Sequence, residues 1–251
     1  MKLKHYLWIG LLVMTVILCV LPGYSQHVHK KLGFQFSTVG ALSAGIYDGM
    51  TTFKDIKQQG NFGLGTLEGL DGELIALDGK FFQVKGDGVA YPVKDEMKTP
   101  FAAVTFFRKE RTVRVKERMT YEGLQQAIDQ QLSSKNLPYA IRIQGIFPYL
   151  KVRSAPKQKP PYPPISEVIK RSQVIFELRN VQGTLVGFRL PQYFKSVNTD
   201  GYHFHFITSD RKAGGHLLDG EFLDTHAEIE TLRDWHIALP NHASFEQATL
   251  N

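Results

Sequence analysis

The chain has 251 residues, of which 43% are hydrophobic, and it carries a formal net charge of +6. This is enough apolar material to bury the core of one large domain or two small ones. Basic and acidic residues are mixed, as in VTFFRKERTVRVKER, and no basic stripe is interleaved with aromatic residues, so nucleic acid is not an expected partner.

The first 25 residues have the pattern of a secretory signal peptide. Lys2 and Lys4 precede an unbroken apolar run over residues 6–21, which ends at a Pro-Gly pair. The run is shorter than the roughly 20 residues that span a bilayer comfortably. We therefore expect cleavage before Gln26 and export to the periplasm or the exterior, with no membrane attachment afterwards. An uncleaved membrane anchor is the alternative.

Cleavage would remove two lysines and no acid, which lowers the net charge to +4, and it would also remove Cys19, the single cysteine. The mature chain would then contain no thiol. It could fold in an oxidising compartment without disulfides, and cysteine catalysis would be excluded. Any metal ion must therefore be held by His, Asp and Glu.

Residues 26–155 are expected to form an N-terminal β-rich half. Thr51 or Thr52 is positioned to cap a short helix that ends at Lys57. Residues 65–93 contain short β-prone runs separated by Asp-Gly and Gly-Asp-Gly sequences, which predicts hairpins. The other elements expected in this half are strands at 102–107 and 112–115, a helix at 121–132 and a strand pair within 139–154.

A proline-rich segment, APKQKPPYPP, follows and has five prolines in ten residues. Such a segment cannot join a helix or a central strand, so residues 156–164 are expected to connect two halves. In the C-terminal half, residues 165–251, Ser166 is expected to cap a helix through Arg171, and strand patterning resumes after it. The predicted fold class is mixed α and β and strand-rich, with two β-sheet-based halves and a three-histidine metal site in the second.

Three of the nine histidines lie within GYHFHFITSDRKAGGH, which begins at Gly201. In a strand, alternate side chains share a face, so His203 and His205 point the same way. If the segment after the polar turn pairs as an antiparallel neighbour, His216 lies opposite them. Three imidazoles with one open position are typical of a catalytic zinc site, although iron, nickel and copper accept the same ligands. An incidental His-x-His pair is the competing interpretation.

Acid–base partners cannot be chosen by pattern alone, because each carboxylate is equally compatible with a surface position. The candidates before and after the histidines are Glu68, Asp71, Glu73, Glu221, Asp224, Glu228 and Glu246. Arg142 and Arg153 are possible binders of an anion.

Four motifs taken together closely resemble the α-acetolactate decarboxylase family. They are, in order, GNFGLGTLEGLDGELIALDGKFFQVKGDG, FPYLKVRSAPKQKPPYPP, VQGTLVGFRLP and GYHFHFITSDRKAGGHLLD. The resemblance extends from about Phe34 to the C-terminus. It implies a zinc enzyme, a carboxy-lyase, that converts 2-acetolactate to acetoin and carbon dioxide, and it suggests a homodimer.

The resemblance also assigns roles to individual residues. It implies that His203, His205 and His216 bind the metal ion and that Glu73 and Arg153 belong to the site. Thr66 would line the substrate site. A glutamate of the C-terminal tail would reach the metal, and Glu246 is its nearest match.

The implied chemistry suits these residue types. Loss of carbon dioxide from a β-keto acid leaves an electron pair that must delocalise onto the ketone oxygen as an enediolate, which a metal ion can stabilise. Arg153 can hold the carboxylate by a planar two-point contact, and it is counted as both a substrate-binding and a catalytic residue. Glu73, with Glu246 as competitor, is the hypothetical proton donor.

Three other functions stay open. The enzyme could act on a different 2-hydroxy-3-keto acid, or the chain could be an exported binding protein that keeps the metal site without turnover. A purely structural role is the third, although it would leave the three histidines unexplained. Export is itself unusual, because acetolactate is ordinarily used in the cytoplasm.

Overall fold

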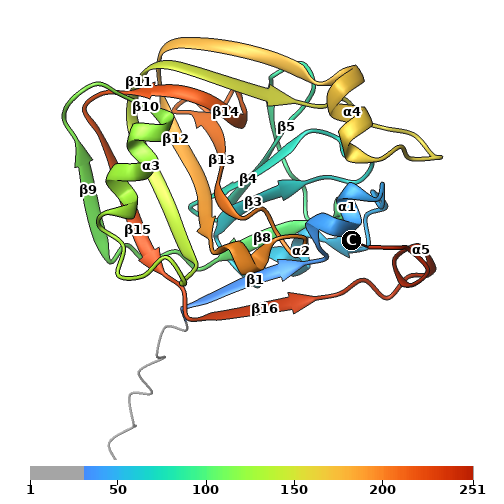
Figure 1. Cartoon of the computed structure of the whole chain (residues 1–251). Helices are drawn as coiled ribbons and strands as arrows, with labels where there is room; N and C mark the ends of the chain where they lie inside the picture. Colours follow the sequence, from blue (N-terminus) through green and yellow to red (C-terminus); the bar gives the residue numbers. More distant parts are fainter. Residues whose placement is uncertain (1–30, 251) are drawn as a thin grey trace, which may run out of the picture.

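The computed structural model describes residues 31–250, and strands dominate it (Figure 1). The predicted signal peptide and its cleavage point lie outside the described residues. None of the helices in the described part of the chain is long and apolar enough to cross a membrane. The chain is strand-rich and mixed α and β, as the sequence predicted.

Fourteen of the strands form two seven-stranded sheets. The first has the order β16 (Asp234–Ala238), β1 (Leu32–Phe36), β8 (Ala102–Thr105), β3 (Phe62–Thr66), β4 (Glu73–Leu77), β5 (Lys80–Val84) and β6 (Ala90–Pro92). The second has the order β10 (Met119–Thr120), β14 (Gly214–Phe222), β13 (Gly201–Thr208), β12 (Val174–Leu190), β11 (Tyr139–Ser154), β15 (Thr225–Thr231) and β9 (Arg111–Val115). Two short strands, β2 (Thr51–Thr52) and β7 (Lys98–Thr99), pair separately.

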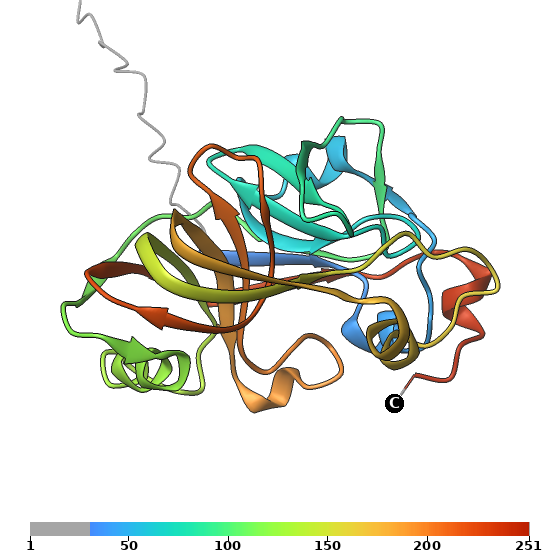
Figure 2. The same ribbon diagram turned by 90° about the horizontal axis from the view of Figure 1, so that it is seen from above.

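The two sheets pack face to face over a shared core, and Figure 2 shows them as stacked layers. Large side chains of β3 and β5 in the first sheet meet those of β12 and β13 in the second, for example Phe62 against Phe188. Helix α2 (Phe53–Lys57) contributes to a core on the outer side of the first sheet, and α3 (Tyr121–Asp129) covers a core beside the second. The remaining helices are short: α1 (Val39–Ser43), α4 (Ile165–Ser172), the 3-10 turn η1 (Gln192–Phe194) and α5 (Ala243–Glu246).

The predicted hairpins and the first helix are confirmed. Strands β3 to β6 are successive antiparallel neighbours. Asp78 and Gly79 connect β4 to β5 with φ values of 52° and 75°, the left-handed pair that a two-residue hairpin turn requires. Thr52 caps α2 by accepting a hydrogen bond from the Asp55 N–H.

Two predictions about residues 139–171 are wrong. Residues 139–154 form one strand, not a strand pair, because β12 stays antiparallel to them on both sides of Pro148. Pro148 lacks an N–H, so it interrupts the ladder without turning the chain. Ser166 does not cap α4 either. The carbonyl of Pro164 accepts from the N–H groups of Glu167 and Val168, so the helix begins one residue before Ser166.

The strands of the two sheets do not follow the chain order. Strands β9, β10 and β11 precede the proline-rich segment yet belong to the second sheet, whereas β16 returns from the C-terminus to pair in parallel with β1. The proline-rich segment is tied to the first part of the chain: the Tyr47 hydroxyl donates to the Pro163 carbonyl at 2.9 Å, and the Gln158 N–H donates to the Gly69 carbonyl at 2.7 Å.

Candidate metal centre and active site

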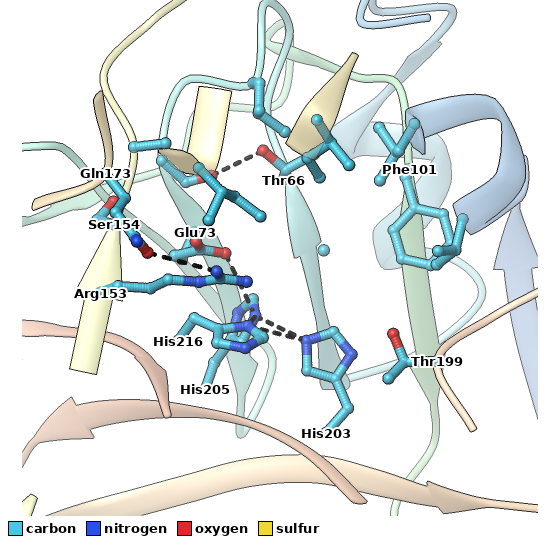
Figure 3. A pocket seen from close by; sticks show the side chains of 18 residues that line it. Thr66, Glu73, Phe101, Arg153, Ser154, Gln173, Thr199, His203, His205 and His216 are labelled. Carbon is cyan, nitrogen blue, oxygen red and sulfur yellow. Dashed lines mark hydrogen bonds and ion pairs between the residues drawn. The ribbon is translucent and has the colours of Figure 1, made fainter. Parts of the chain in front are cut away.

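Two neighbouring strands bring the three histidines together. Strands β13 and β14 are antiparallel, and His205 lies directly opposite His216 in their register. His203 lies two residues before His205 and shares its face of β13. Gly214 allows the close approach of the two strands, because a Cβ at this position would lie 2.1 Å from the Phe206 carbonyl oxygen. The expected convergence of the three rings is confirmed (Figure 3).

The three rings point one nitrogen each at a common centre. His203 Nε2 lies 3.2 Å from both His205 Nε2 and His216 Nδ1, which are 3.3 Å apart. His205 Nδ1 lies 2.8 Å from the Leu74 carbonyl oxygen and must donate its proton there, which leaves Nε2 as a bare acceptor. With that nitrogen unprotonated, no placement of protons on the other two satisfies all three contacts. At least one pair always sets two lone pairs or two N–H groups against each other.

A divalent cation fits this arrangement, because it would accept all three lone pairs at once. The histidines are also held in the neutral form that a metal ion needs. Burial, with Arg153 nearby, lowers the pKa of His203 to about 4. Burial and the neighbouring rings hold the pKa values of His205 and His216 well below the usual range. The described residues thus include three histidines that could hold a metal ion.

A carboxylate from the other sheet completes the centre. Glu73 is the first residue of β4, and its Oε2 lies 3.3 Å from His205 Nε2. Burial raises the pKa of Glu73 to about 7, while the Arg153 guanidinium lowers it. Glu73 is therefore close enough to act as a fourth ligand. Without a metal ion, a pKa of about 7 leaves its carboxyl group partly protonated near neutral pH.

Arg153, which belongs to β11, lies beside the histidines. Its partner in the β11–β14 ladder is His216, and its Nη1 donates to Gln173 Oε1 in a long contact of 3.4 Å. Among the described residues no carboxylate forms an ion pair with Arg153, so the guanidinium is available to an anion in the cavity.

The two remaining predicted site residues lie differently. Thr66 lines the cavity, but its hydroxyl donates to the Gly72 carbonyl at 2.7 Å, so only its lone pairs are free. Glu246 is exposed at the end of α5 and is not among the residues that line the cavity. The structure therefore brings together five of the seven predicted residues closely, places Thr66 at the wall and leaves Glu246 outside.

The cavity itself has a volume of about 130 Å³ and a mixed lining. Polar and charged groups come from the histidines, Glu73, Arg153 and Gln173. The apolar part of the lining consists of Val39, Leu42, Leu70, Phe101, Ile165 and Ile169. A small molecule with a charged group and an alkyl group would suit this combination.

Sequence analysis missed Gln173, Thr199 and Phe101. Gln173 follows α4, Thr199 lies in the turn before β13, and Phe101 precedes β8. No motif marks any of them, since each reaches the cavity only through the packing of elements far apart in the sequence.

Comparisons with known proteins agree with this geometry. The protein family described as alpha-acetolactate decarboxylase matches residues 34–251. The chain belongs to the alpha-acetolactate decarboxylase family. It is 46% identical over 231 residues to the alpha-acetolactate decarboxylase of Methanosarcina mazei, covering 92% of this chain and 80% of that protein. It is 45% identical to the Methylococcus capsulatus enzyme of the same name, covering 86% and 83%.

A solved structure extends the family likeness to the fold. The crystal structure of alpha-acetolactate decarboxylase from Bacillus subtilis superposes with a TM-score of 0.86 at 40% identity, covering 88% of this chain and 94% of that one. Membership of the alpha-acetolactate decarboxylase family makes this chain an enzyme of the carboxy-lyase class that decarboxylates acetolactate, with a small molecule as its substrate.

Proposed function

We propose that this chain catalyses the zinc-dependent decarboxylation of 2-acetolactate to acetoin and carbon dioxide. One observation carries the proposal: three imidazole nitrogens within 3.3 Å of one another share a cavity with Glu73 and Arg153. Simple retention of a metal ion requires neither the acid nor the guanidinium.

Arg153 holds the carboxylate that leaves. Its planar guanidinium offers two parallel N–H groups to the two carboxylate oxygens, and Gln173 restricts how the guanidinium can turn. The bond from the carboxylate carbon to the hydroxyl-bearing carbon breaks, carbon dioxide departs, and the bonding electrons move onto the ketone oxygen as an enediolate. Orienting the carboxylate out of the ketone plane favours this step.

His203, His205 and His216 would hold the zinc ion. When bound, zinc supplies Lewis-acid stabilisation of the negative charge that develops on the ketone oxygen, worth several kcal/mol. His and carboxylate ligands also suit iron, nickel and copper, so zinc is proposed on ligand chemistry alone.

Glu73 then returns a proton to the carbon that lost carbon dioxide, which fixes the stereochemistry of acetoin. Its raised pKa favours the protonated form that can donate near neutral pH. Glu246 is the competing donor. To act, it would have to leave its exposed position in α5 and enter the cavity.

A different 2-hydroxy-3-keto acid is the alternative substrate. Apolar side chains such as Leu42, Phe101 and Ile169 line the cavity, and a longer alkyl group could pack against them. Relative turnover of 2-acetolactate and a homologue with a longer alkyl group would decide between them. A binding protein without turnover is the second alternative.

We further propose that the chain is exported, cleaved before Gln26 and assembled as a homodimer. The export proposal follows from the charge and apolar pattern of residues 1–25. Mass spectrometry of the protein recovered from the producing cell tests it. A mature N-terminus at Gln26 supports cleavage, and an intact Met1 in the membrane fraction indicates the anchor instead.

One preparation tests the proposed function. The chain from Gln26 to Asn251 is analysed for bound metal, and acetoin is measured from racemic 2-acetolactate with and without a chelator. Acetoin formation that the chelator abolishes and zinc restores supports the proposal. One equivalent of bound metal without acetoin would rule out this substrate and leave the two alternatives.

A further inference from the structure

Gln173 is the side-chain partner of Arg153, and the pairing of β11 with β12 brings the two together. Ile175 lies opposite Arg153 in that ladder, and Gln173 lies two residues before Ile175, just outside β12. Side chains two residues apart in an extended chain share a face, so Gln173 is a diagonal neighbour of Arg153. The backbone of Gln173 is extended, with a ψ value of 141°. Figure 3 shows its amide group beside the guanidinium in the cavity wall.

The partner of Arg153 carries no charge, whereas two other arginines of the same sheet are held by carboxylates. Arg142 Nε donates to Glu228 Oε2 at 2.7 Å, and Arg189 Nε lies 3.5 Å from Asp129 Oδ1. In both cases the carboxylate compensates the charge of the guanidinium. An amide oxygen accepts a hydrogen bond from Arg153 Nη1 without doing so. The positive charge of Arg153 is therefore left for the carboxylate of a bound molecule.

The amide nitrogen of Gln173 is also available to a bound molecule. Within residues 31–250 no group accepts a hydrogen bond from Gln173 Nε2. A glutamine amide combines an acceptor oxygen with two N–H donors, so its oxygen can hold Arg153 while its nitrogen donates to an anion. Both side chains line the cavity that contains the three histidines. A carboxylate in this cavity could therefore accept hydrogen bonds from the guanidinium and from the amide together.

We propose that Gln173 recognises the substrate carboxylate together with Arg153, holding the guanidinium through its oxygen and donating to the carboxylate through its nitrogen. This inference rests on the proposed function, because it takes 2-acetolactate as the substrate. The carboxylate is fully charged before the reaction, whereas the carbon dioxide that leaves is neutral. Contacts with it are therefore at least as strong in the ground state as in the transition state. Gln173 thus contributes to KM more than to kcat.

Steady-state turnover of 2-acetolactate by the zinc-loaded protein tests this role. Gln173→Glu keeps the shape and the acceptor oxygen but adds a negative charge that compensates Arg153 and repels the substrate. KM should rise by about tenfold or more, with a much smaller change in kcat. Gln173→Met keeps the length but has no polar hydrogen-bonding group, so KM should rise by a smaller factor. Gln131→Glu adds the same charge at an exposed position outside the cavity lining, and it should change neither constant.

Binding without turnover provides a second measurement. The molecule 2-hydroxy-2-methylpropanoate has the carboxylate and the hydroxyl group of the substrate but no ketone to accept the electron pair, so it cannot lose carbon dioxide by this route. Titration calorimetry should show that it binds the zinc-loaded wild type and that Gln173→Glu weakens this binding by about tenfold or more. Bound zinc and thermal unfolding of each variant show whether the metal centre and the fold are intact.

Two results would overturn the proposal. An unchanged KM and an unchanged affinity for 2-hydroxy-2-methylpropanoate in both Gln173 variants mean that Arg153 binds the carboxylate alone. A fall in kcat at constant KM means that Gln173 does not act on the carboxylate. The binding measurement does not depend on acetoin formation. A wild type that binds 2-hydroxy-2-methylpropanoate through Gln173 yet forms no acetoin would therefore contradict the proposed function and leave this inference standing.

Discussion

At the scale of single residues, the centre depends on the protonation of groups that water no longer reaches. Burial favours the neutral forms of both the histidines and Glu73, so it lowers the pKa values of the histidines and raises that of Glu73. The histidines resist gaining a proton, whereas Glu73 resists losing one. In the metal-free protein all four groups are therefore neutral over a common range of pH.

Glu73→Gln tests the titration of that carboxyl in the metal-free protein. The pKa of Glu73 is about 7 in the folded chain and near 4.5 when exposed. Between these values the folded chain binds a proton that the unfolded chain has released, so the stability of the wild type falls as pH rises from about 4.5 to 7. Above 7 the loss is complete.

The Gln variant should lack this component. Chemical denaturation of chelated protein at pH 5 and pH 8 measures it, and Glu68→Gln is the control because Glu68 is exposed in the neighbouring loop. Equal pH dependence in the wild type and the Glu73→Gln variant would show that Glu73 titrates normally. Full turnover by Glu73→Gln would remove it from the proposed mechanism.

His216→Ala tests the metal centre. Loss of even an outer partner of a metal ligand commonly costs 10- to 100-fold in affinity, so loss of one of three ligands should weaken zinc binding by more than about 100-fold. Competition with a fluorescent chelator measures the change. His226→Ala is the matched control, since His226 lies on β15 away from the cavity. Unchanged affinity in His216→Ala would mean that the metal ion binds elsewhere.

At the scale of elements, a buried polar network holds the turn before β13. Asn198 Nδ2 donates to Gln35 Oε1 at 2.7 Å, and Asn198 Oδ1 accepts from the Thr199 N–H at 2.7 Å. Trp235 Nε1 also donates to Gln35 Oε1, so β1 and β16 fix the turn jointly. The turn carries Thr199 into the cavity wall and leads directly to His203.

Asn198→Ala should therefore destabilise the fold and loosen the site. Removing one partner of a buried hydrogen bond costs about 1–3 kcal/mol. Thermal and chemical unfolding measure this cost, and KM for 2-acetolactate should rise as the wall becomes mobile. Asn241→Ala, at an exposed position, should change neither quantity. A stability loss with an unchanged KM would restrict the network to a structural role.

Sequence reasoning succeeded where local periodicity decides the structure. The two-residue period of a strand placed His203 and His205 on one face, and the short polar turn after Thr208 returned His216 opposite them. Residues 139–154 were misjudged because Gly145 and Pro148 are common in turns, whereas here the ladder with β12 keeps the chain extended.

Contacts between distant elements carry no local signal. The parallel pairing of β1 with β16 joins the two ends of the described chain, and the sequence of neither strand predicts that the other is its partner. Gln173 and Thr199 could not be predicted as cavity residues either, because the sequence around each of them contains no motif. Glu73 and Arg153 were identified through the family resemblance, since their own patterns fit many surface positions equally well.

At the scale of the whole molecule, the metal ion should stabilise the fold, because its ligands converge only in the folded chain. Zinc present at 100 times its dissociation constant would add about 2.7 kcal/mol to the free energy of unfolding. Calorimetry with and without a chelator measures this stabilisation. The His216→Ala variant should show little response, and an equal response in both proteins would assign the effect to another site.

The centre also joins the two sheets. His205 stands on the second sheet, yet its Nδ1 is held by the Leu74 carbonyl of the first, one residue beyond Glu73. A chain whose sheets have not docked can at most gather three imidazoles, without the carboxyl group or the fixed tautomer. Turnover would therefore be a direct measure of docking, because only a molecule whose two sheets are in place has a complete centre.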